Sequence, residues 1–274
     1  TYLDLGKVYY RQGVGFFKNP SDLLLPSCSQ EKRSYDGERR KMEGRVMLRG
    51  QYFSPSAVFE VIYSPIVQWD KDKKKYLNYL GKQQEEQIIL CSVAGHAYGF
   101  DLTGSAGYDR RLRLGGNMSY VVGSNLEVHM ELAVDQKDET RIKKINGLYQ
   151  QLIGETANDI RIKNQRLIPR LIFGGHYTLP FRWNLMVEYY FNGLGFYPRE
   201  WDQILQRLKE HNDEYAIPEK RPPVMTTLGT AKSLVGLTGI PGMVRHYGML
   251  RLANDLSTKT SLEMIGLFNL MDWS

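Results

Sequence analysis

Two histidines and one serine are the residues of this sequence that could support nucleophilic catalysis. His129 and His176 are candidate general bases, and Ser119 is expected opposite His129 across a hairpin. A Ser–His pair that hydrolyses lipid must face lipid, whereas the alternation of residue types places both side chains with the charged residues. A membrane-embedded lipid hydrolase is therefore the least favoured hypothesis, and no enzymatic activity is expected.

Charged side chains of both signs recur at alternate positions within otherwise apolar stretches. Alternate residues of a strand share a face, so these side chains would line one surface. This surface would be a water-filled channel whose transverse field selects solutes, or a salt-bridge lattice that fills the interior, and the two can coexist. Arginines outnumber carboxylates by a small margin, which predicts a mild preference for anions. The predicted lining residues are Arg45, Arg49, Glu60, Arg111, Arg113, Glu127, His129, Glu131, Arg170, His176, Glu188, Arg251 and Glu263.

Other classes of site find little support in the sequence. Phosphate-loop, metal-binding and dinucleotide-binding motifs are absent, so no cofactor or metal is expected. Cys28 and Cys91 lie far apart and outside any C-x-x-C or His-rich context, which indicates structural or incidental roles. The formal net charge is +6. Apart from residues 71–75 and 38–41 the charges do not cluster, and nucleic acid is therefore a minor hypothesis.

The composition is that of a folded chain without spanning helices. Among 274 residues, 42% are hydrophobic, 12% aromatic and 24% charged, which is too apolar for a disordered protein. No stretch reaches the roughly 18 consecutive apolar residues that a transmembrane helix needs. The chain opens at Thr1 in a strand-like pattern without a leader. We expect that any secretion signal has been removed or lies upstream.

A period of two predicts β-hairpins. From Arg111 to Val122 apolar and polar residues alternate, and after the turn at residues 123–125 the alternation restarts, which places Arg113 opposite Asp135. A two-residue turn at residues 54–55 would pair Phe53 with Ser56. That register puts Arg49 opposite Glu60 on the inward face.

About eleven strands can be read in this way, most of them near the roughly 9 to 11 residues that cross a bilayer when tilted. Connections at 11–44, 64–86, 135–165 and 193–246 are long, and those at 54–55, 95–97, 123–125, 179–182 and 254–259 are short. Outer-membrane barrels sort their loops by length, with short periplasmic turns and long external loops. A soluble all-β domain is the alternative, because alternation alone is equally expected there. The predicted strands are residues 2–10, 45–53, 56–63, 87–94, 98–108, 111–122, 126–135, 166–178, 183–192, 247–253 and 260–271.

One connection, residues 193–246, carries a predicted helix. Residues 198–210 place apolar side chains at helical spacing, which indicates a short amphipathic helix. Such a surface should not remain in water, so this long loop is the predicted constriction of the channel. Its apolar residues are Trp201, Ile204, Leu205 and Leu208.

Three segments resemble porin-like barrels of Gram-negative outer membranes. Residues 5–22 (LGKVYYRQGVGFFKNPSD) are similar to a strand and following loop in which Gly-Lys or Gly-Arg precedes Gly-x-Gly and an Asn-Pro-x-Asp turn. The second segment is residues 188–193 (EYYFNG), which are followed by Gly195 and Trp201. The third is residues 245–247 (RHY) together with the strand that ends at 269–274 (NLMDWS). In the resembling proteins further strands follow the position of Ser274. The resemblance therefore implies an incomplete barrel.

These observations together predict an all-β fold, an antiparallel transmembrane β-barrel of about eleven visible strands that forms one domain over residues 1–274. The expected location is the outer membrane, in contact with its lipid. The expected function is passive diffusion of small hydrophilic solutes, with a mild preference for anions. No nucleic-acid partner is expected, and the oligomeric state is left open. The alternative is a non-conducting barrel that acts as a scaffold or sleeve for a partner protein.

Overall fold

The structure is a computed structural model of the whole chain. It describes residues 1–8, 10–24, 45–67, 86–153, 166–214, 217, 221–238, 244–257 and 260–271. Cys28 and the charge runs at 38–41 and 71–75, named in the sequence analysis, lie outside these residues. By their contacts the residues divide into two compact units. The first comprises 1–135, 170–189 and 249–266, and the second comprises 136–169, 190–248 and 267–274.

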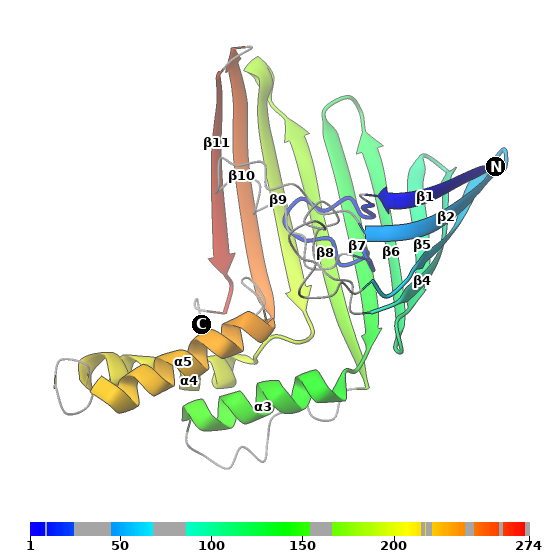
Figure 1. Cartoon of the computed structure of the whole chain (residues 1–274). Coiled ribbons are helices and arrows are strands. Elements are labelled where there is room, and N and C mark those ends of the chain that lie inside the picture. Colours follow the sequence, from blue (N-terminus) through cyan, green and yellow to red (C-terminus); the bar gives the residue numbers. More distant parts are fainter. Residues whose placement is uncertain are drawn as a thin grey trace. The chain divides into compact units, whose positions relative to one another are not determined.

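One antiparallel sheet of eleven strands dominates the fold, as the period-two pattern predicts. Each strand is hydrogen-bonded to its neighbours in sequence, so the topology is a simple meander from β1 to β11 (Figure 1). Among the described residues the sheet is not closed, since β1 and β11 are its two end strands. The all-β prediction is confirmed, and barrel closure stays a prediction. The strands are β1 Tyr2–Val8, β2 Arg45–Phe53, β3 Ala57–Ser64, β4 Ile88–Ala97, β5 Phe100–Tyr108, β6 Leu112–Val122, β7 Leu126–Gln136, β8 Leu167–Thr178, β9 Trp183–Asn192, β10 His246–Ser257 and β11 Thr260–Asn269.

Of the two predicted registers, one is confirmed and one is wrong by two residues. Arg113 lies opposite Asp135 across β6 and β7, as expected from the turn at 123–125. Across β2 and β3, however, Gln51 rather than Arg49 lies opposite Glu60. The turn is longer than predicted because the backbone N–H of Ser54 donates to Ala57 O at 2.8 Å, and the Ser54 hydroxyl accepts from Ala57 N at 3.0 Å. A shift of two keeps each side chain on its predicted face.

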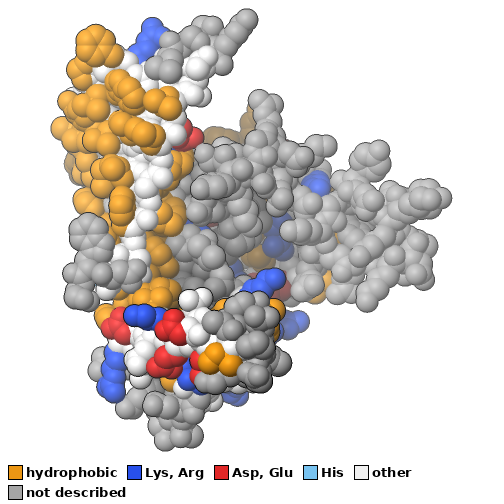
Figure 2. All heavy atoms as spheres, turned by 90° about the vertical axis from the view of Figure 1, so that its left-hand side faces the viewer, with side chains coloured by type: hydrophobic (Ala, Val, Ile, Leu, Met, Phe, Trp, Pro, Cys, Tyr) orange, Lys and Arg blue, Asp and Glu red, His pale blue; other side chains and the backbone are white. Residues whose placement is uncertain are grey.

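The two faces of the sheet differ in polarity, and β3 illustrates the difference. We call the face with Phe59, Val61 and Tyr63 the outer face; these side chains are 49%, 55% and 42% exposed. The opposite, inner face carries Glu60 and Ile62, which are 6% and 0% exposed. β7 and β9 repeat this pattern, and Figure 2 shows hydrophobic side chains gathered along one side of the strands. The sheet thus exposes its apolar face and buries a face rich in charge.

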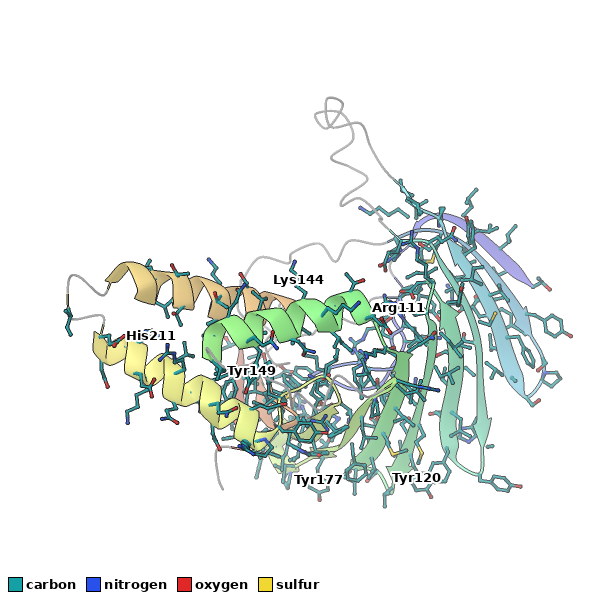
Figure 3. The ribbon with its side chains drawn as sticks, turned by 90° about the horizontal axis from the view of Figure 1, so that it is seen from below. Arg111, Tyr120, Lys144, Tyr149, Tyr177 and His211 are labelled. Carbon is teal, nitrogen blue, oxygen red and sulfur yellow. The ribbon has the colours of Figure 1, made fainter. Side chains whose placement is uncertain are left out.

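Outer-face aromatic residues mark several strands of the first unit. Tyr120 of β6 and Tyr177 of β8 lie on the outer side of the sheet (Figure 3). Tyr52 of β2 and Phe59 of β3 are directly opposite each other, with ring centroids 6.4 Å apart. Such cross-strand aromatic pairs stabilise a sheet through packing on one face.

In its described residues the second unit contains three α-helices that pack on one another: α3 Glu139–Ile153, α4 Pro198–Glu214 and α5 Arg221–Thr238. The predicted helix at 198–210 is confirmed as α4, with one further turn. α3 and α5 were not predicted. The 3₁₀ turn η4 Pro180–Arg182 links β8 to β9 in the first unit. None of the helices in the described ranges is long and apolar enough to cross a membrane.

The helices share a small hydrophobic core. Ile142, Ile145 and Leu152 of α3 meet Ile204 of α4, with Phe196 beside them. Tyr149 stacks on Phe196 at 5.4 Å between ring centroids and donates to Gln203 at 2.5 Å, whereas Lys144 lies on the exposed side of α3 (Figure 3). This arrangement follows from apolar residues at helical spacing, which form one stripe along each helix.

The predicted constriction residues occupy different places in this helical unit. Ile204 is fully buried in the core. Trp201 and Leu208 are partly buried and pack against this core. Leu205 is 41% exposed. Their role in a constriction stays a prediction.

The helical core can be tested by truncating one buried and one exposed side chain of α4. We expect Ile204→Ala to destabilise the helical unit by about 2–5 kcal/mol, because the buried side chain leaves a cavity. Leu205→Ala is the matched control, and its effect should stay within about 0.5 kcal/mol. The measurement is denaturant unfolding followed by the helical circular dichroism signal. Equal effects of the two variants would contradict the packing described above.

Candidate functional site

A segment between β1 and β2 lies against the inner face of the sheet. We call residues 10–24 (YRQGVGFFKNPSDLL) the inner strap. Figure 1 shows this blue segment beside β7 and β8. Its buried residues include Gln12, Phe17, Asn19, Ser21 and Asp22. A segment without regular secondary structure must satisfy its backbone polar groups in another way when it is buried.

The carboxylate of Glu131 in β7 accepts several of the hydrogen bonds that the strap backbone needs. Its side chain is completely buried, and its carboxylate accepts the N–H groups of Val14 and Gly15, both at 2.5 Å. The other oxygen accepts the Ser21 N–H at 3.2 Å and the Ser21 hydroxyl at 2.8 Å. A buried carboxylate needs several donors to offset the loss of hydration, and charge-assisted bonds of this kind are strong. One side chain therefore fixes two separate parts of the strap.

Glu188 of β9 continues the same arrangement. It is 1% exposed and accepts the N–H groups of Phe16 at 2.6 Å and Phe17 at 2.8 Å. His129 Nε2 lies 3.0 Å from the same carboxylate. Gly174 allows this close packing, because a Cβ there would lie 2.7 Å from Glu188 Cγ. Four consecutive N–H groups of the strap thus bind two carboxylates.

A third buried carboxylate, Glu60 of β3, holds the beginning of the strap. The Tyr10 hydroxyl donates to it, and so do Arg49 Nε at 2.5 Å and Gln51 Nε2 at 2.9 Å. Burial, together with the hydrogen bond to Glu60, raises the pKa of Tyr10 above its usual range. Tyr10 is therefore a neutral donor at any ordinary pH. Asp4 lies 3.6 Å from Arg49 and extends the polar network onto β1.

Two glycines and one turn shape the strap for these contacts. Gly13 has a φ of 98°, and a Cβ there would lie 2.6 Å from a Glu131 oxygen. A Cβ at Gly15 would collide with the Lys18 carbonyl and lie 3.1 Å from Ile172. The segment 19–22 forms the turn expected from Asn-Pro-Ser-Asp, since Asp22 N donates to Asn19 O at 3.1 Å. The Gly-x-Gly pattern therefore has a local steric cause.

The end of the strap is held mainly by apolar contacts. Leu23 and Leu24 belong to a buried cluster with Met47, Ile62 and Leu90. Arg113 Nη1 also donates to the Leu23 carbonyl at 3.1 Å. The strap thus has an anchored beginning and end and a middle held by carboxylates.

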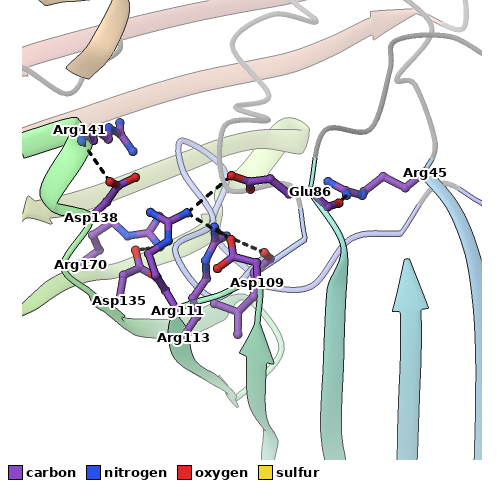
Figure 4. Close-up of polar contacts among 10 residues, drawn as sticks. Arg45, Glu86, Asp109, Arg111, Arg113, Asp135, Asp138, Arg141 and Arg170 are labelled. Carbon is purple, nitrogen blue, oxygen red and sulfur yellow. Dashed lines mark hydrogen bonds and ion pairs between the residues drawn. The ribbon is translucent and has the colours of Figure 1, made fainter. Parts of the chain in front are cut away.

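A cluster of arginines and acids lies at one end of strands β2, β4, β6, β7 and β8 (Figure 4). Arg111 and Arg113 both bind Asp109, and Arg170 binds Asp135 at 2.6 Å. The Arg45 Nη2 donates to the Glu86 carbonyl at 2.9 Å. Most of these guanidinium groups therefore have an acidic neighbour. Pairing of this kind weakens the field that each arginine presents to a passing solute.

The predicted lining residues are all on the inner face, although they do not form one site. Arg251 binds Glu263 at 2.5 Å, and His176 Nε2 lies 3.2 Å from Asn184. Glu127 shares the inner side of β7 with His129 and Glu131. Asp109 and Asp135, which the predicted set lacks, complete the arginine cluster. They follow the same alternation as the residues around them, so the sequence carried a signal for both.

Ser119 of β6 lies directly opposite His129 of β7, as predicted, and both side chains are on the inner face. His129 Nε2, however, contacts Glu188 instead of a nucleophile. In the part of the chain that the structure describes, no group of three or more His, Cys, Asp or Glu side chains is arranged to hold a metal ion.

Comparisons with known proteins add no relative. No family model, curated protein or solved structure matches this chain.

The steric requirement at Gly13 can be tested with one pair of variants. We expect Gly13→Ala to lower the free energy of unfolding by about 1–3 kcal/mol, because alanine disfavours a positive φ and its methyl group would displace Glu131. Gly50→Ala is the control, since a Cβ at Gly50 meets no atom within 4 Å and should change stability by no more than about 0.5 kcal/mol. Urea unfolding of the folded protein measures both. A Gly13→Ala protein as stable as the parent would contradict the close approach described here.

Proposed function

We propose that this chain builds the wall of an outer-membrane β-barrel that admits small hydrophilic solutes by passive diffusion. The observation that supports it is the reversed polarity of the sheet. A soluble antiparallel sheet buries its apolar face and exposes its polar face to water. Here apolar side chains such as Leu112 and Val187 are 50% and 52% exposed, whereas Glu131 and Glu188 are buried. Lipid is the environment in which such an outer face is stable.

The inner strap gives the proposed channel its constriction. A barrel of more than about eleven strands has a lumen too wide for wall side chains alone to fill. The strap lies against the inner side of the wall and takes up part of the space that the barrel would enclose. Solutes would then pass beside the strap, in addition to any narrowing by the segment 193–246.

A weak preference for anions belongs to this proposal. The predicted lining set holds six arginines and five glutamates, and this small excess favours anions. The pairing of Arg113 with Asp109 and of Arg170 with Asp135 limits the effect. We therefore expect a small selectivity, not the strong selectivity of a dedicated anion pore.

A second candidate is a barrel that does not conduct and serves as a scaffold or sleeve for a partner protein. The observation in its favour is the strap itself, which occupies part of the inner face through buried contacts. The two candidates share the fold and the membrane and differ only in whether water passes.

Membrane insertion can be tested on the outer face of β7. We expect Met130→Arg to destabilise the folded protein by about 2–4 kcal/mol if this position is near the bilayer midplane. Leu126→Arg, on the same face but next to the turn, should cost about 0–1 kcal/mol because the side chain reaches the interface. Heat-modifiable migration on gels distinguishes folded from unfolded protein across a denaturant series in detergent. A protein that is soluble and monodisperse without detergent would rule out membrane insertion.

The channel activity can be tested by planar-bilayer conductance of the full-length protein under a salt gradient. We expect discrete channels and a small reversal potential of the sign that indicates anion preference. Absence of channels would favour the scaffold. A cation-selective reversal potential would contradict the role given to the arginines.

A further inference from the structure

We propose that two aromatic residues at turns, Tyr98 and Phe181, anchor one end of the sheet in the headgroup layer of a phospholipid membrane. Tyr98 lies in the turn between β4 and β5, and Phe181 lies in η4, between β8 and β9. Both turns belong to the first unit, and both are at the same end of the sheet because it is an antiparallel meander. The inference rests on the proposed membrane location and adds a binding partner for this end of the sheet.

Both residues are exposed and have a backbone conformation that does not suit them. Tyr98 is 98% exposed with a φ of 53°, and Phe181 is 90% exposed with a φ of 60°. The left-handed region disfavours residues that have a Cβ, and hairpin turns favour Gly, Asn or Asp there. A single exposed aromatic residue is ordinary on a protein surface. Two of them in unfavourable turn positions, where their rings add almost no packing, indicate a partner outside the chain.

The first turn is in contact with the apolar outer face. Gly99 follows Tyr98 with a φ of 84°, and a Cβ at Gly99 would lie 2.8 Å from the Tyr120 ring. That ring lies on the outer side of the sheet (Figure 3), and its centroid is 4.6 Å from that of Phe100. The turn at 98–99 therefore continues the face for which we propose contact with lipid.

The second turn has similar surroundings. Tyr177 precedes it on the outer face of β8, and Trp183 follows it at an outer position of β9. Arg182, directly after Phe181, is exposed and has a φ of 65°. An aromatic ring beside a guanidinium group suits the headgroup layer, because the ring can enter the edge of the acyl region while the cation meets phosphate.

The length of β5 places Tyr98 at a membrane boundary. At the other end of this strand the apolar outer face ends at Tyr108, because Asp109 and Arg110 follow. Positions 98 and 108 are ten residues apart, which is about 33 Å along a strand and about 25 Å along the membrane normal at a tilt of about 40°. The apolar band of an outer-membrane barrel is also about 25 Å tall. With Tyr108 at one boundary of this band, Tyr98 falls at the other.

Two other turns at this end are polar and supply a control position. The turns at 54–56 and 123–125 consist of Ser, Pro, Gly and Asn residues. In the second of them the Ser124 hydroxyl donates to Asn125 Oδ1 at 2.7 Å. Small polar residues of this kind are those that a turn in water normally contains. We therefore expect position 124 to remain in water while the aromatic turns meet lipid.

Spin labelling in phosphatidylcholine vesicles tests the contact with the headgroup layer. A nitroxide is placed at 98, 181, 124 or 130, one position at a time, in the full chain with both cysteines changed to serine. The ratio of oxygen accessibility to nickel-chelate accessibility should be lower at 98 and 181 than at position 130 of β7, and higher than at 124. A ratio at 98 and 181 equal to that at 124 would overturn the anchor. If position 130 has this low ratio as well, the proposed membrane location fails with it.

Substitution by asparagine separates anchoring from a role in the turns. Asparagine tolerates a left-handed φ, so a purely structural role predicts that Tyr98→Asn combined with Phe181→Asn leaves stability equal or higher. We expect instead that this double variant lowers the folding equilibrium constant in phosphatidylcholine vesicles by about tenfold or more, because two rings lose their contact with lipid. Tyr98→Trp combined with Phe181→Trp keeps the aromatic rings and should retain the constant of the parent. Denaturant titration measures both, and an asparagine variant as stable as the parent would overturn the proposal.

Discussion

Burial of carboxylate charge is the constraint on which the interior of this protein depends. Glu131, Glu188 and Glu60 come from β7, β9 and β3, and each is removed from water. A buried charge is tolerated only where donors surround it, and here the donors come largely from the strap backbone. The strap in turn has no sheet partner for its N–H groups and needs these acceptors. Wall and strap therefore supply each other's hydrogen-bond partners. A Cβ at Gly13 would displace Glu131 of the wall, and one at Gly15 would meet the Lys18 carbonyl of the strap itself.

The same constraint explains the polarity of the sheet. A face that must hold three carboxylates and their partners cannot also be the apolar face, so the apolar residues of each strand fall on the other side. In water that outer face would be a large exposed hydrophobic patch, which soluble monomers rarely carry. In lipid it is the expected surface of a barrel wall. The reversed polarity and the strap are thus two consequences of one arrangement.

The sequence predicts the strands well because a period of two is a local property. The turn at 123–125 also fixes a register, whereas the turn after Phe53 depends on the Ser54 side chain, which a count of turn residues overlooks. The sequence analysis predicts only a long connection at 135–165, although Ile142, Ile145, Tyr149 and Leu152 of α3 follow helical spacing. α5 gives a weaker signal, since it begins with two prolines and contains Gly229.

The candidate site could be predicted only in part. Alternation assigns Glu131 and Glu188 to the inner face, but their partners in the strap lie at least 110 and at least 171 residues away in the chain, respectively. Backbone donors have no sequence signature, so the strap contacts could not be derived from residue types.

Site-directed spin labelling along β7 tests the central claim most directly, namely that the sheet turns its apolar face to lipid and its charged face inward. A nitroxide is placed in turn at each position of 126–136 in the protein reconstituted in lipid vesicles, and its accessibility to oxygen and to a water-soluble nickel chelate is measured. The account predicts a period of two, with high oxygen access at even positions such as 128 and 130 and low access to both reagents at 129 and 131. Even positions that favour the water-soluble reagent, or a profile without alternation, would contradict it.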